Sequence, residues 1–269
     1  MTQPHPTYHA WVGQFAALHS APLPAPRPPA HVPPAETNQP VALILAPHPD
    51  DEIIMGALPL RWQVELGWRV RVVAMTLGSN PSRQEARRSE LAHACGLLGW
   101  DLDILGWDHV GKEAHNPQPD RIDHLKHFID HLRPQAVFFP HPLDAHPVHQ
   151  GVHRLAQEAV ALSNARPAVY WTEFWHPMES PNLLVEVSPP ILASLVEALA
   201  CHAGEISRNP YHRTLPAWMM DNVRRGAERI SGTGCQAPEF PFGVLYRTEP
   251  APPQPILPAS PPNANPTLD

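Results

Sequence analysis

Residues 41–52 read Val-Ala-Leu-Ile-Leu-Ala-Pro-His-Pro-Asp-Asp-Glu and contain the transition that decides the fold. The first half, 41–46, is a short apolar run, which is typical of a strand buried in a parallel sheet. The second half, 46–52, places one imidazole and three carboxylates directly after that strand. In an open parallel sheet, ligands bind at the carboxyl ends of the strands. The stretch therefore predicts a buried strand with a candidate site at its end.

Strand-like and helix-like segments alternate along the chain after this stretch. Three further runs are expected strands, namely 69–77, 101–106 and 135–140. Four segments are expected helices, namely 52–66, 83–98, 121–132 and about 149–162. Beyond residue 168 the alternation is less regular, with expected strands at 168–175 and 183–187 and expected helices at 190–201 and 214–229. This order predicts a Rossmann-like α/β fold, in which a largely parallel sheet is flanked by helices.

Proline divides the chain into three parts. The 269 residues include 37 prolines, of which 8 lie in residues 20–40 and another 8 in residues 250–269. We therefore expect an N-terminal short helix and Pro-rich strap over 1–40, one domain over 41–249, and a Pro-rich C-terminal tail over 250–269. Proline at this density breaks helices, so an all-helical bundle is excluded.

The short N-terminal helix is expected at residues 8–19. Helical spacing places Trp11, Phe15 and Leu18 on one face, and we expect this face to pack on the domain. The residues that follow, 20–40, are expected to form an extended linker or surface strap because of their prolines.

The composition argues against several classes of partner and site. The formal net charge is −7 and no basic stripe is present, so nucleic acid is not an expected partner. No run of about 18 apolar residues occurs, so we expect no membrane span. Cys95, Cys201 and Cys235 are far apart, which argues against a cysteine zinc site or a disulfide framework and fits a reducing compartment. The first residues lack a basic region followed by an apolar run, so we expect no secretory signal and a cytoplasmic protein.

A second segment rich in histidine follows the expected strand at 135–140. Residues 140–149 read Pro-His-Pro-Leu-Asp-Ala-His-Pro-Val-His. They offer one carboxylate and three imidazoles, from Asp144, His141, His146 and His149. If the two strands are neighbours, both loops meet at the same edge of the sheet. His48 and Asp51 in the first loop are close enough in sequence to bind one ion from a single turn.

Together, the two loops contain the parts of a catalytic metal site. Two histidines and one carboxylate with an open position form a ligand set of catalytic zinc, and Fe²⁺, Co²⁺ and Mn²⁺ accept the same donors. Zinc lowers the pKa of bound water to about 7. A spare carboxylate would serve as general base and then acid, and a spare histidine would stabilise an oxyanion. Taken alone, Asp50, Asp51 and Glu52 also fit a plain acidic helix N-terminus.

Three motifs resemble those of the LmbE-like or PIG-L family of zinc-dependent N-deacetylases. Residues 46–52 are similar to the family's A-H-P-D-D-E, with one added proline. Residues 142–149 read P-x-D-x-H-P-x-H, which is similar to the family's P-x-D-x-H-x-D-H. Residues 87–99 contain R-x-x-E followed by L-G, as in a helix of the family. The resemblance covers about 41–247 and implies an LmbE-like fold for this domain.

The resemblance implies a role for each matching residue. It makes His48, Asp51 and His149 the zinc ligands, Asp50 the general base and acid, and His146 the residue that steadies the tetrahedral oxyanion. One position departs from the motif, because Val148 stands where members usually have the Asp that is thought to orient the oxyanion histidine. The Val148 side chain cannot accept a hydrogen bond. Either Asp144 or another group orients His146, or His146 is held less well.

Several other residues have weaker assignments. The resemblance implies that Arg87 binds a substrate hydroxyl, and the alternative is a helix-surface ion pair with Glu90. His141 and His153 are expected to pack or to support the site rather than to bind metal. The turn at 78–80, Gly-Ser-Asn, is expected to border the pocket. Weaker resemblances to family positions occur later in the chain, at Glu173, His202 and Glu239-Phe240.

The sequence therefore leads to three functional hypotheses. The first is a zinc-dependent hydrolase that removes an acetyl or other acyl group from the nitrogen of an N-acetylglucosamine-type sugar or conjugate. The second keeps amide hydrolysis but gives it a non-sugar N-acyl substrate, such as a thiol conjugate or a natural product. The third is a metal-binding protein without catalysis, which the departure at Val148 favours and the retained Asp50 opposes. The expected partner is a small-molecule N-acyl substrate, and the resemblance also implies a homo-oligomer.

Overall fold

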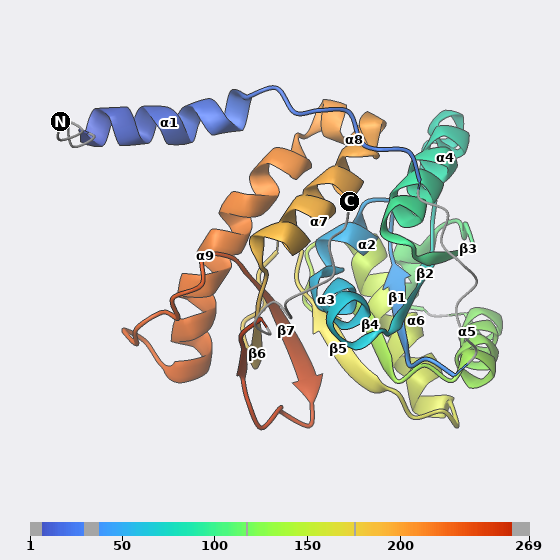
Figure 1. The fold of residues 1–269 in the computed structure, drawn as a ribbon. Coiled ribbons are helices and arrows are strands. Elements are labelled where there is room, and N and C mark those ends of the chain that lie inside the picture. The colour runs from blue at the N-terminus through green and yellow to red at the C-terminus, as the bar shows by residue number, and fades with distance from the viewer. Residues whose placement is uncertain (1–6, 30–37, 117, 175, 260–269) are drawn as a thin grey trace.

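The structure, a computed structural model, describes residues 7–29, 38–116, 118–174 and 176–259. Within these residues, one mixed sheet of eight strands has the order β3-β2-β1-β4-β5-β7-β6-β8. Helices lie against both faces of this sheet, and helix α1 extends away from it (Figure 1). This arrangement confirms the α/β class.

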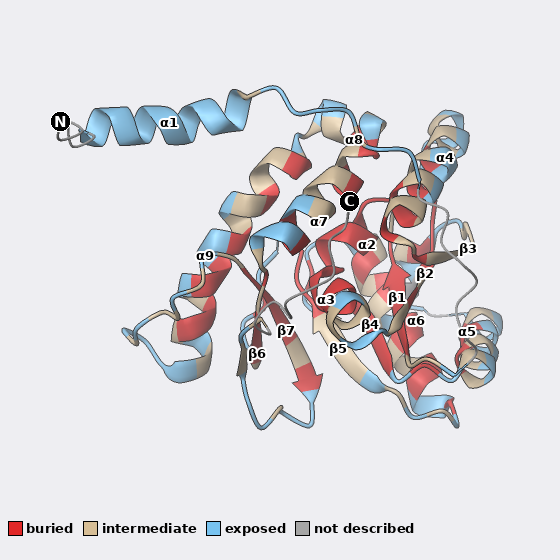
Figure 2. Ribbon diagram, viewed as in Figure 1, coloured by how far each residue is buried: buried red, intermediate tan, exposed pale blue. Residues whose placement is uncertain are grey.

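The first half of the sheet is parallel. Its strands are β1 (Val41–Ala46), β2 (Arg69–Ala74), β3 (Asp101–Ile104), β4 (Ala136–Pro140) and β5 (Ala168–Thr172). Strand β1 lies between β2 and β4, so that Leu43 is opposite Arg71 on one side and Val137 on the other. Every residue of β1 is buried, which explains its uninterrupted apolar sequence (Figure 2). The prediction of a largely parallel sheet is confirmed.

Alternate residues of β1 enter two different hydrophobic cores. Ala42, Ile44 and Ala46 belong to a core on one face, and Leu43 and Leu45 belong to a core on the other. The two cores follow from the strand geometry, because successive side chains point to opposite faces of a sheet. Burial of both faces holds β1 at the centre of the molecule.

Helices connect the parallel strands and cover both faces. They are α2 (Asp51–Ile54), α3 (Ala57–Leu66), α4 (Pro81–Leu98), the 3₁₀ helix η1 (Val110–Ala114), α5 (Pro119–Leu132) and α6 (Pro147–Leu162). The sequence predicted one helix over 52–66, but the structure has two, which are separated at Met55-Gly56. Within the described ranges, none of the helices combines the length and the apolar composition that a membrane span requires.

The second half of the sheet is largely antiparallel. It contains β6 (Leu183–Glu186) and β7 (Gly243–Glu249), together with the helices α7 (Pro189–Ala200), α8 (Ala203–Arg208) and α9 (Tyr211–Ser231). Strand β7 lies between β5 and β6 and is antiparallel to both. The sequence did not predict β7 or α8. Strand β7 is joined to its partners only through pairings that are distant in the sequence, and α8 has six residues and no usable periodicity.

The segment after residue 249 takes part in the sheet. Strand β8 (Ile256–Leu257) pairs in parallel with β6. The buried Arg61 guanidinium donates to the carbonyls of Leu257 at 3.2 Å and Pro258 at 2.9 Å. The expected boundary between domain and tail at residue 249 therefore differs from the structure, in which the sheet includes residues 256–257. Residues of a proline-rich segment that are not proline keep their backbone N–H groups and can still pair with a strand. Residues 260–269 lie outside the described residues.

Helix α1 (Tyr8–Ser20) forms where the sequence predicts a helix, but it does not pack on the domain. All of its residues are exposed, and Trp11, Phe15 and Leu18 have exposed fractions of 59%, 47% and 73%. The expected contact of this face with the domain is therefore wrong. Arg213 donates to the His19 carbonyl near the end of the helix at 2.9 Å, and the helix extends away from this contact (Figure 1).

Residues 21–29 lie on the surface of the domain as an extended segment. The Arg27 backbone N–H donates to Glu197 on α7 at 2.8 Å, and its side chain forms an ion pair with the same carboxylate. A His93 ring nitrogen on α4 contacts the Arg27 carbonyl at 2.7 Å. This segment therefore contacts two helices. Residues 1–6 and 30–37 of the expected N-terminal part lie outside the described residues.

Tyr246→Phe should destabilise the protein through the junction of α2 and α3. The fully buried Tyr246 hydroxyl donates to the Met55 carbonyl at 2.9 Å and accepts from the Leu58 N–H at 3.1 Å. Removal of the hydroxyl leaves both backbone groups buried without this partner, so the free energy of unfolding in urea should fall by about 1–3 kcal/mol. Tyr8→Phe on exposed α1 is the matched control and should change it by less than about 0.5 kcal/mol. Equal values for the two variants would contradict the prediction.

Candidate functional site

The loops after all five parallel strands line one cavity of about 630 Å³, a volume typical of small-molecule sites. The loops after β1 and β4 contribute six of its ionisable groups, namely His48, Asp50, Asp51, Asp144, His146 and His149. Because β1 and β4 are paired neighbours, the two loops meet as expected. They meet where the chain order reverses, since β2 and β3 lie on one side of β1 and β4 on the other. Open α/β sheets place ligands at such a switch point.

The first loop is held in a strained conformation at Asp50. This residue has φ 115° and ψ −31°, a region that residues other than glycine rarely adopt. Its backbone N–H donates to Glu52 Oε2 at 2.8 Å, and the Ile53 N–H donates to its carbonyl at 3.2 Å. The strained turn ends β1 and begins α2, and it directs both Asp50 and Asp51 to the cavity.

Glu52 supports this turn from inside the protein. Its side chain is fully buried, and Oε1 contacts His202 Nε2 at 2.7 Å. His202 is also fully buried and lies between α7 and α8. Of the three adjacent carboxylates, Asp50 and Asp51 therefore line the cavity and Glu52 lies behind them. The weak sequence resemblance at His202 has a structural counterpart, because this side chain fixes Glu52.

Three donor atoms converge at the end of β1. Asp51 Oδ2 lies 3.1 Å from His48 Nδ1 and 3.2 Å from His149 Nε2. Zinc forms bonds of about 2.0–2.2 Å to nitrogen and oxygen, so tetrahedral ligands lie roughly 3.3 Å apart. The two contacts of Asp51 Oδ2 are close to this spacing, and two nitrogens with one oxygen suit zinc as well as Fe²⁺, Co²⁺ or Mn²⁺.

His146 lies at the same place and offers an alternative third ligand. One ring nitrogen each of His48, His146 and His149 lie within 4.8 Å of one another. The structure thus brings together all of the ligands implied by the sequence, and it adds a histidine triad as a second set. Asp51 Oδ2 lies within 3.2 Å of a ring nitrogen of both His48 and His149, so the two candidate sets share these two histidines.

Asp144 supports His149. Its Oδ2 lies 3.2 Å from His149 Nδ1, on the side of the ring away from Asp51. A carboxylate behind a histidine ligand fixes the ring orientation and raises its basicity. Burial disfavours the imidazolium of His149, but Asp51 and Asp144 outweigh burial and raise its pKa to about 10.

The two adjacent aspartates differ in their electrostatics. Burial raises the pKa of Asp50 well above its usual value, and the nearby carboxylates of Asp51 and Glu52 add to the increase. Burial acts in the same direction on Asp51, but His149 and His48 outweigh it and hold its pKa far below the usual range. One carboxylate is thus suited to hold a cation and the other to exchange a proton.

The backbone N–H of Val148, and not a side-chain carboxylate at this position, contacts the His146 ring. The Val148 N–H donates to His146 Nδ1 at 3.2 Å, so that His146 is the N-cap of α6. Asp144 Oδ1 accepts from the His146 backbone N–H at 2.8 Å. Because Nδ1 accepts a hydrogen bond, the proton of the neutral ring is on Nε2. Burial, followed by the neighbouring His48 and His149, lowers the pKa of His146 and favours this neutral form.

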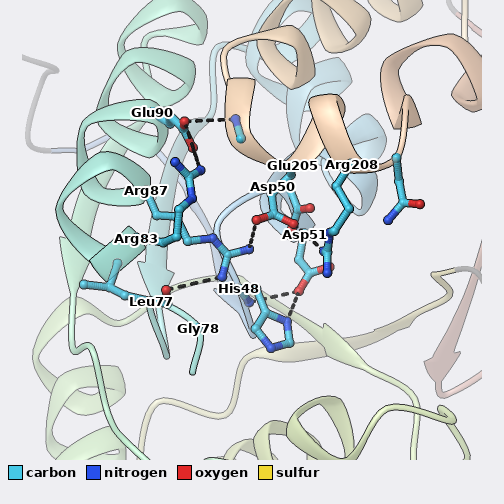
Figure 3. A network of polar contacts seen from close by, with 12 residues as sticks. His48, Asp50, Asp51, Leu77, Gly78, Arg83, Arg87, Glu90, Glu205 and Arg208 are labelled. Carbon is cyan, nitrogen blue, oxygen red and sulfur yellow. Dashed lines mark hydrogen bonds and ion pairs between the residues drawn. The ribbon is translucent and has the colours of Figure 1, made fainter. Parts of the chain in front are cut away.

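Arg87 lines the same cavity and pairs with a residue that the sequence did not indicate. Its Nη2 is 3.0 Å from Glu205 Oε1 on α8, and Nη1 donates to the Leu77 carbonyl at 3.3 Å (Figure 3). The alternative ion pair with Glu90 is wrong, because Glu90 is 3.4 Å from Arg83. Gly78 makes room for Arg87, since a Cβ there would lie 2.0 Å from Nη1.

The remaining histidines named from the sequence have supporting positions. His141 is buried and its Nε2 contacts the His176 carbonyl at 3.1 Å. His153 Nδ1 contacts the Pro140 carbonyl at 2.9 Å. Glu173 is fully buried and accepts from Arg225 at 2.8 Å, so it links β5 to α9. The turn at 78–80 borders the cavity through Gly78 and Ser79.

Among the cavity residues that the sequence did not single out are Glu205, Arg208 and Phe174. Glu205 and Arg208 come from α8, which carries no periodic signal. Phe174 follows β5, and its ring centroid lies 4.4 Å from that of His149. The rule that ligands bind at the carboxyl ends of strands would have identified Phe174, because it lies two residues beyond the end of β5.

Comparisons with known proteins show which family and which solved structures this chain is similar to. Residues 43–160 match the family model PIG-L, described as GlcNAc-PI de-N-acetylase. A probable N-acetyl-α-D-glucosaminyl L-malate deacetylase 2 from Bacillus anthracis is 28% identical over 194 residues, with 63% of this chain and 83% of the relative covered.

Two solved structures have a similar fold. N,N′-diacetylchitobiose deacetylase from Pyrococcus horikoshii has a TM-score of 0.60 at 18% identity and covers 93% of this chain and 96% of its own. GalB, the 4-carboxy-2-hydroxymuconate hydratase from Pseudomonas putida KT2440, has a TM-score of 0.62 at 17% identity and covers 78% of this chain and 96% of its own. Because these two enzymes differ in reaction, the shared fold alone does not decide the chemistry.

Metal content should distinguish the two ligand sets. Asp51→Ala and His149→Ala should each lose most of the bound metal, because each removes a donor from the triangle. His146→Ala and His153→Ala should keep it at close to one ion per chain, with His153 as the matched control on the same helix. Metal in the purified proteins is measured by mass spectrometry. Loss in His146→Ala with retention in Asp51→Ala would instead assign the histidine triad.

Proposed function

Because the chain belongs to the PIG-L (LmbE-like) family, we propose that it is a metal-dependent N-deacetylase. The reaction is hydrolysis of the amide of an N-acetylglucosamine-type sugar or conjugate. The observation that carries the proposal is the donor triangle of His48, Asp51 and His149 beside a separate carboxylate, Asp50, in the same cavity. The names of the relatives support the substrate class, since both the family and the Bacillus relative are described by N-acetylglucosamine derivatives.

In this proposal His48, Asp51 and His149 hold the ion, with zinc as the first choice. When bound, the ion would supply Lewis acidity, which makes water a better nucleophile near neutral pH and polarises the acyl carbonyl. Asp144 keeps the His149 ring in place through the 3.2 Å contact at Nδ1.

Asp50 takes the proton of the attacking water and passes it to the nitrogen of the leaving amine. Three features suit it to this role. It lies next to the ligand Asp51, it lines the cavity, and its strained backbone is fixed from behind by Glu52. A pKa raised by burial makes it a stronger base than an ordinary aspartate.

His146 supplies a hydrogen bond to the oxyanion that forms as water attacks the carbonyl. With Nδ1 occupied by the Val148 N–H, the free donor is Nε2–H. The ring acts as a neutral donor in this arrangement, since both its burial and its histidine neighbours disfavour the charged form. The departure at Val148 therefore changes how His146 is oriented and leaves its donor in place.

The alternatives from the sequence differ in what the structure offers them. Hydrolysis of a non-sugar amide, such as one in a thiol conjugate or natural product, would use the same residues. A metal-binding protein without catalysis would not require a second carboxylate on a strained turn. We also propose a cytoplasmic location, which the three free cysteines support, and a homo-oligomer as the family resemblance implies.

Acetate release tests the proposal directly. The wild-type protein, loaded with zinc, should release acetate from N-acetylglucosamine derivatives and not from N-acetylated amino acids or thiol conjugates. Asp50→Asn should keep its metal and lose about 10²–10⁴-fold in kcat, because the general base is removed. Activity on the non-sugar amides alone would favour the alternative substrate class, and full activity of Asp50→Asn would show that Asp50 is not the base.

His146→Ala should lower kcat by about 10²–10³-fold with a smaller effect on KM, because the lost hydrogen bond is strongest in the transition state. The measurement is steady-state acetate release at saturating zinc, so that metal loss does not contribute. His131→Ala, an exposed histidine on α5, is the control and should behave as wild type. A change in KM alone would mean that His146 binds the ground state and does not stabilise the oxyanion.

A further inference from the structure

Helix α1 has one apolar stripe along its length. Successive residues of a helix are about 100° apart, which places five large apolar side chains within an arc of about 120°, namely Tyr8, Trp11, Val12, Phe15 and Leu18. The rings of Trp11 and Phe15 are stacked with centroids 5.9 Å apart, so they share one side of the helix. The other residues of the helix are alanine, glycine, serine, glutamine and histidine. We call the five apolar residues the α1 stripe.

The α1 stripe is exposed to solvent. Exposed fractions of its residues range from 47% at Phe15 to 91% at Tyr8, and the whole helix is exposed (Figure 2). A helix of about 12–15 residues is only marginally stable in water by itself, and most helices in proteins are stabilised by packing of an apolar face. Helix α1 has 13 residues. The helix is therefore expected to pack its stripe against a surface outside its own domain.

The C-terminal end of α1 is fixed so that the stripe is held away from the domain. Arg213 on α9 donates to the carbonyls of His19 at 2.9 Å and Ala21 at 2.6 Å. A few residues later, Arg27 pairs with Glu197 on α7. From this end the helix extends about 20 Å, at about 1.5 Å per residue (Figure 1). The stripe thus lies where a second molecule can reach it.

The charge of the chain favours a second copy over a membrane as that molecule. Residues 1–26 contain no Asp, Glu, Lys or Arg, so the net charge of −7 comes entirely from residues 27–269. Helices that lie on membranes typically have Lys or Arg on their polar face, which attracts them to anionic lipids. This helix has neither, and the acidic domain would be repelled. Two copies of the chain, in contrast, can meet through two uncharged helices without a like-charge contact.

The area of the α1 stripe suits a small and reversible dimer interface. Its three aromatic side chains expose roughly 400 Å² per copy, because such side chains cover about 150–250 Å² each. With Val12 and Leu18 included, two facing stripes would remove roughly 1,000 Å² from water in total, which is about the lower limit for a specific interface. We therefore expect a dimer that forms and dissociates with protein concentration.

We propose that the α1 stripe packs against the α1 stripe of a second copy, so that two chains form a dimer through their N-terminal helices. The same residues contribute from both chains, as in other two-fold interfaces. Phe15 lies at the centre of the stripe and near the middle of the helix, so the two copies of Phe15 face each other across the pair. This pairing goes beyond the proposed deacetylase function and does not rest on it.

Sedimentation equilibrium of the full chain over a hundredfold range of concentration tests the pairing. Wild type should change from monomer to dimer as concentration rises. Phe15→Glu should stay monomeric, because it places two like charges at the centre of the pair. Ala17→Glu is the matched control, because it adds the same charge on the other side of α1 and should still dimerise. A wild type that is monomeric throughout, or a dimer that persists in Phe15→Glu, would overturn the proposal.

Mixing two variants tests whether stripe faces stripe. Phe15→Glu and Phe15→Lys should each be monomeric alone and should form a mixed dimer at low salt, because opposite charges then face each other. Absence of the mixed dimer would mean that α1 docks on another surface of the second copy, which would overturn the pairing. Each variant should unfold at the wild-type urea concentration, because Phe15 is exposed and α1 lies outside the domain core.

Vesicles provide the test of the membrane alternative. Wild-type protein should remain in the supernatant when vesicles of phosphatidylcholine, with or without phosphatidylserine, are sedimented. Sedimentation with the vesicles that Phe15→Glu abolishes, together with a monomeric wild type in their absence, would assign the stripe to lipid and overturn the dimer. None of these measurements requires a substrate, so their outcomes are separate from those of the acetate-release assay.

Discussion

The hydrogen bond between the Asp50 N–H and the Glu52 carboxylate holds the turn on which the site depends. Positive φ at a residue other than glycine costs about 1–3 kcal/mol, so the turn persists only because its surroundings enforce it. The Glu52 carboxylate is held in position by its contact with His202, which lies 150 residues further along the chain. The interaction therefore joins the first parallel strand to the helices of the second half, and it fixes the directions of two aspartates that are adjacent in sequence and differ in their proposed tasks.

The second loop uses backbone groups where a related motif uses a side chain. His146 begins α6 as its N-cap, and the same hydrogen bond from Val148 sets its proton on Nε2. Asp144 is then available to His149. The start of one helix thus orients both the proposed oxyanion donor and a proposed ligand. The orientation depends on helix formation and not on one added carboxylate.

The sequence indicated the parallel half of the sheet and the two loops, because short stretches of neighbouring residues are enough to identify both. Apolar runs mark β1 and β4, and acidic or histidine-rich residues follow each of them directly. The features that it missed depend on distant contacts. The partner of Arg87 is Glu205, over a hundred positions away, and the break at Met55 is stabilised by Tyr246 of β7. The exposure of α1 was missed for the same reason. Its apolar face predicts burial, but the sequence does not show whether another part of the chain packs against that face.

The pairing of β1 with β4 has a consequence for the order of folding. The Val41 N–H donates to the side-chain oxygen of Gln135, which lies just before β4 and 94 residues further along the chain. Strands β2 and β3 lie in the sequence between the two residues. Closing so long an interval is slow relative to local contacts. The proposed metal ligands His48 and His149 follow β1 and β4, the strands at the two ends of that interval. A chain in which β1 and β4 have not yet paired therefore cannot bring the proposed ligands together. A bound ion would therefore report on the completed sheet and hold it closed.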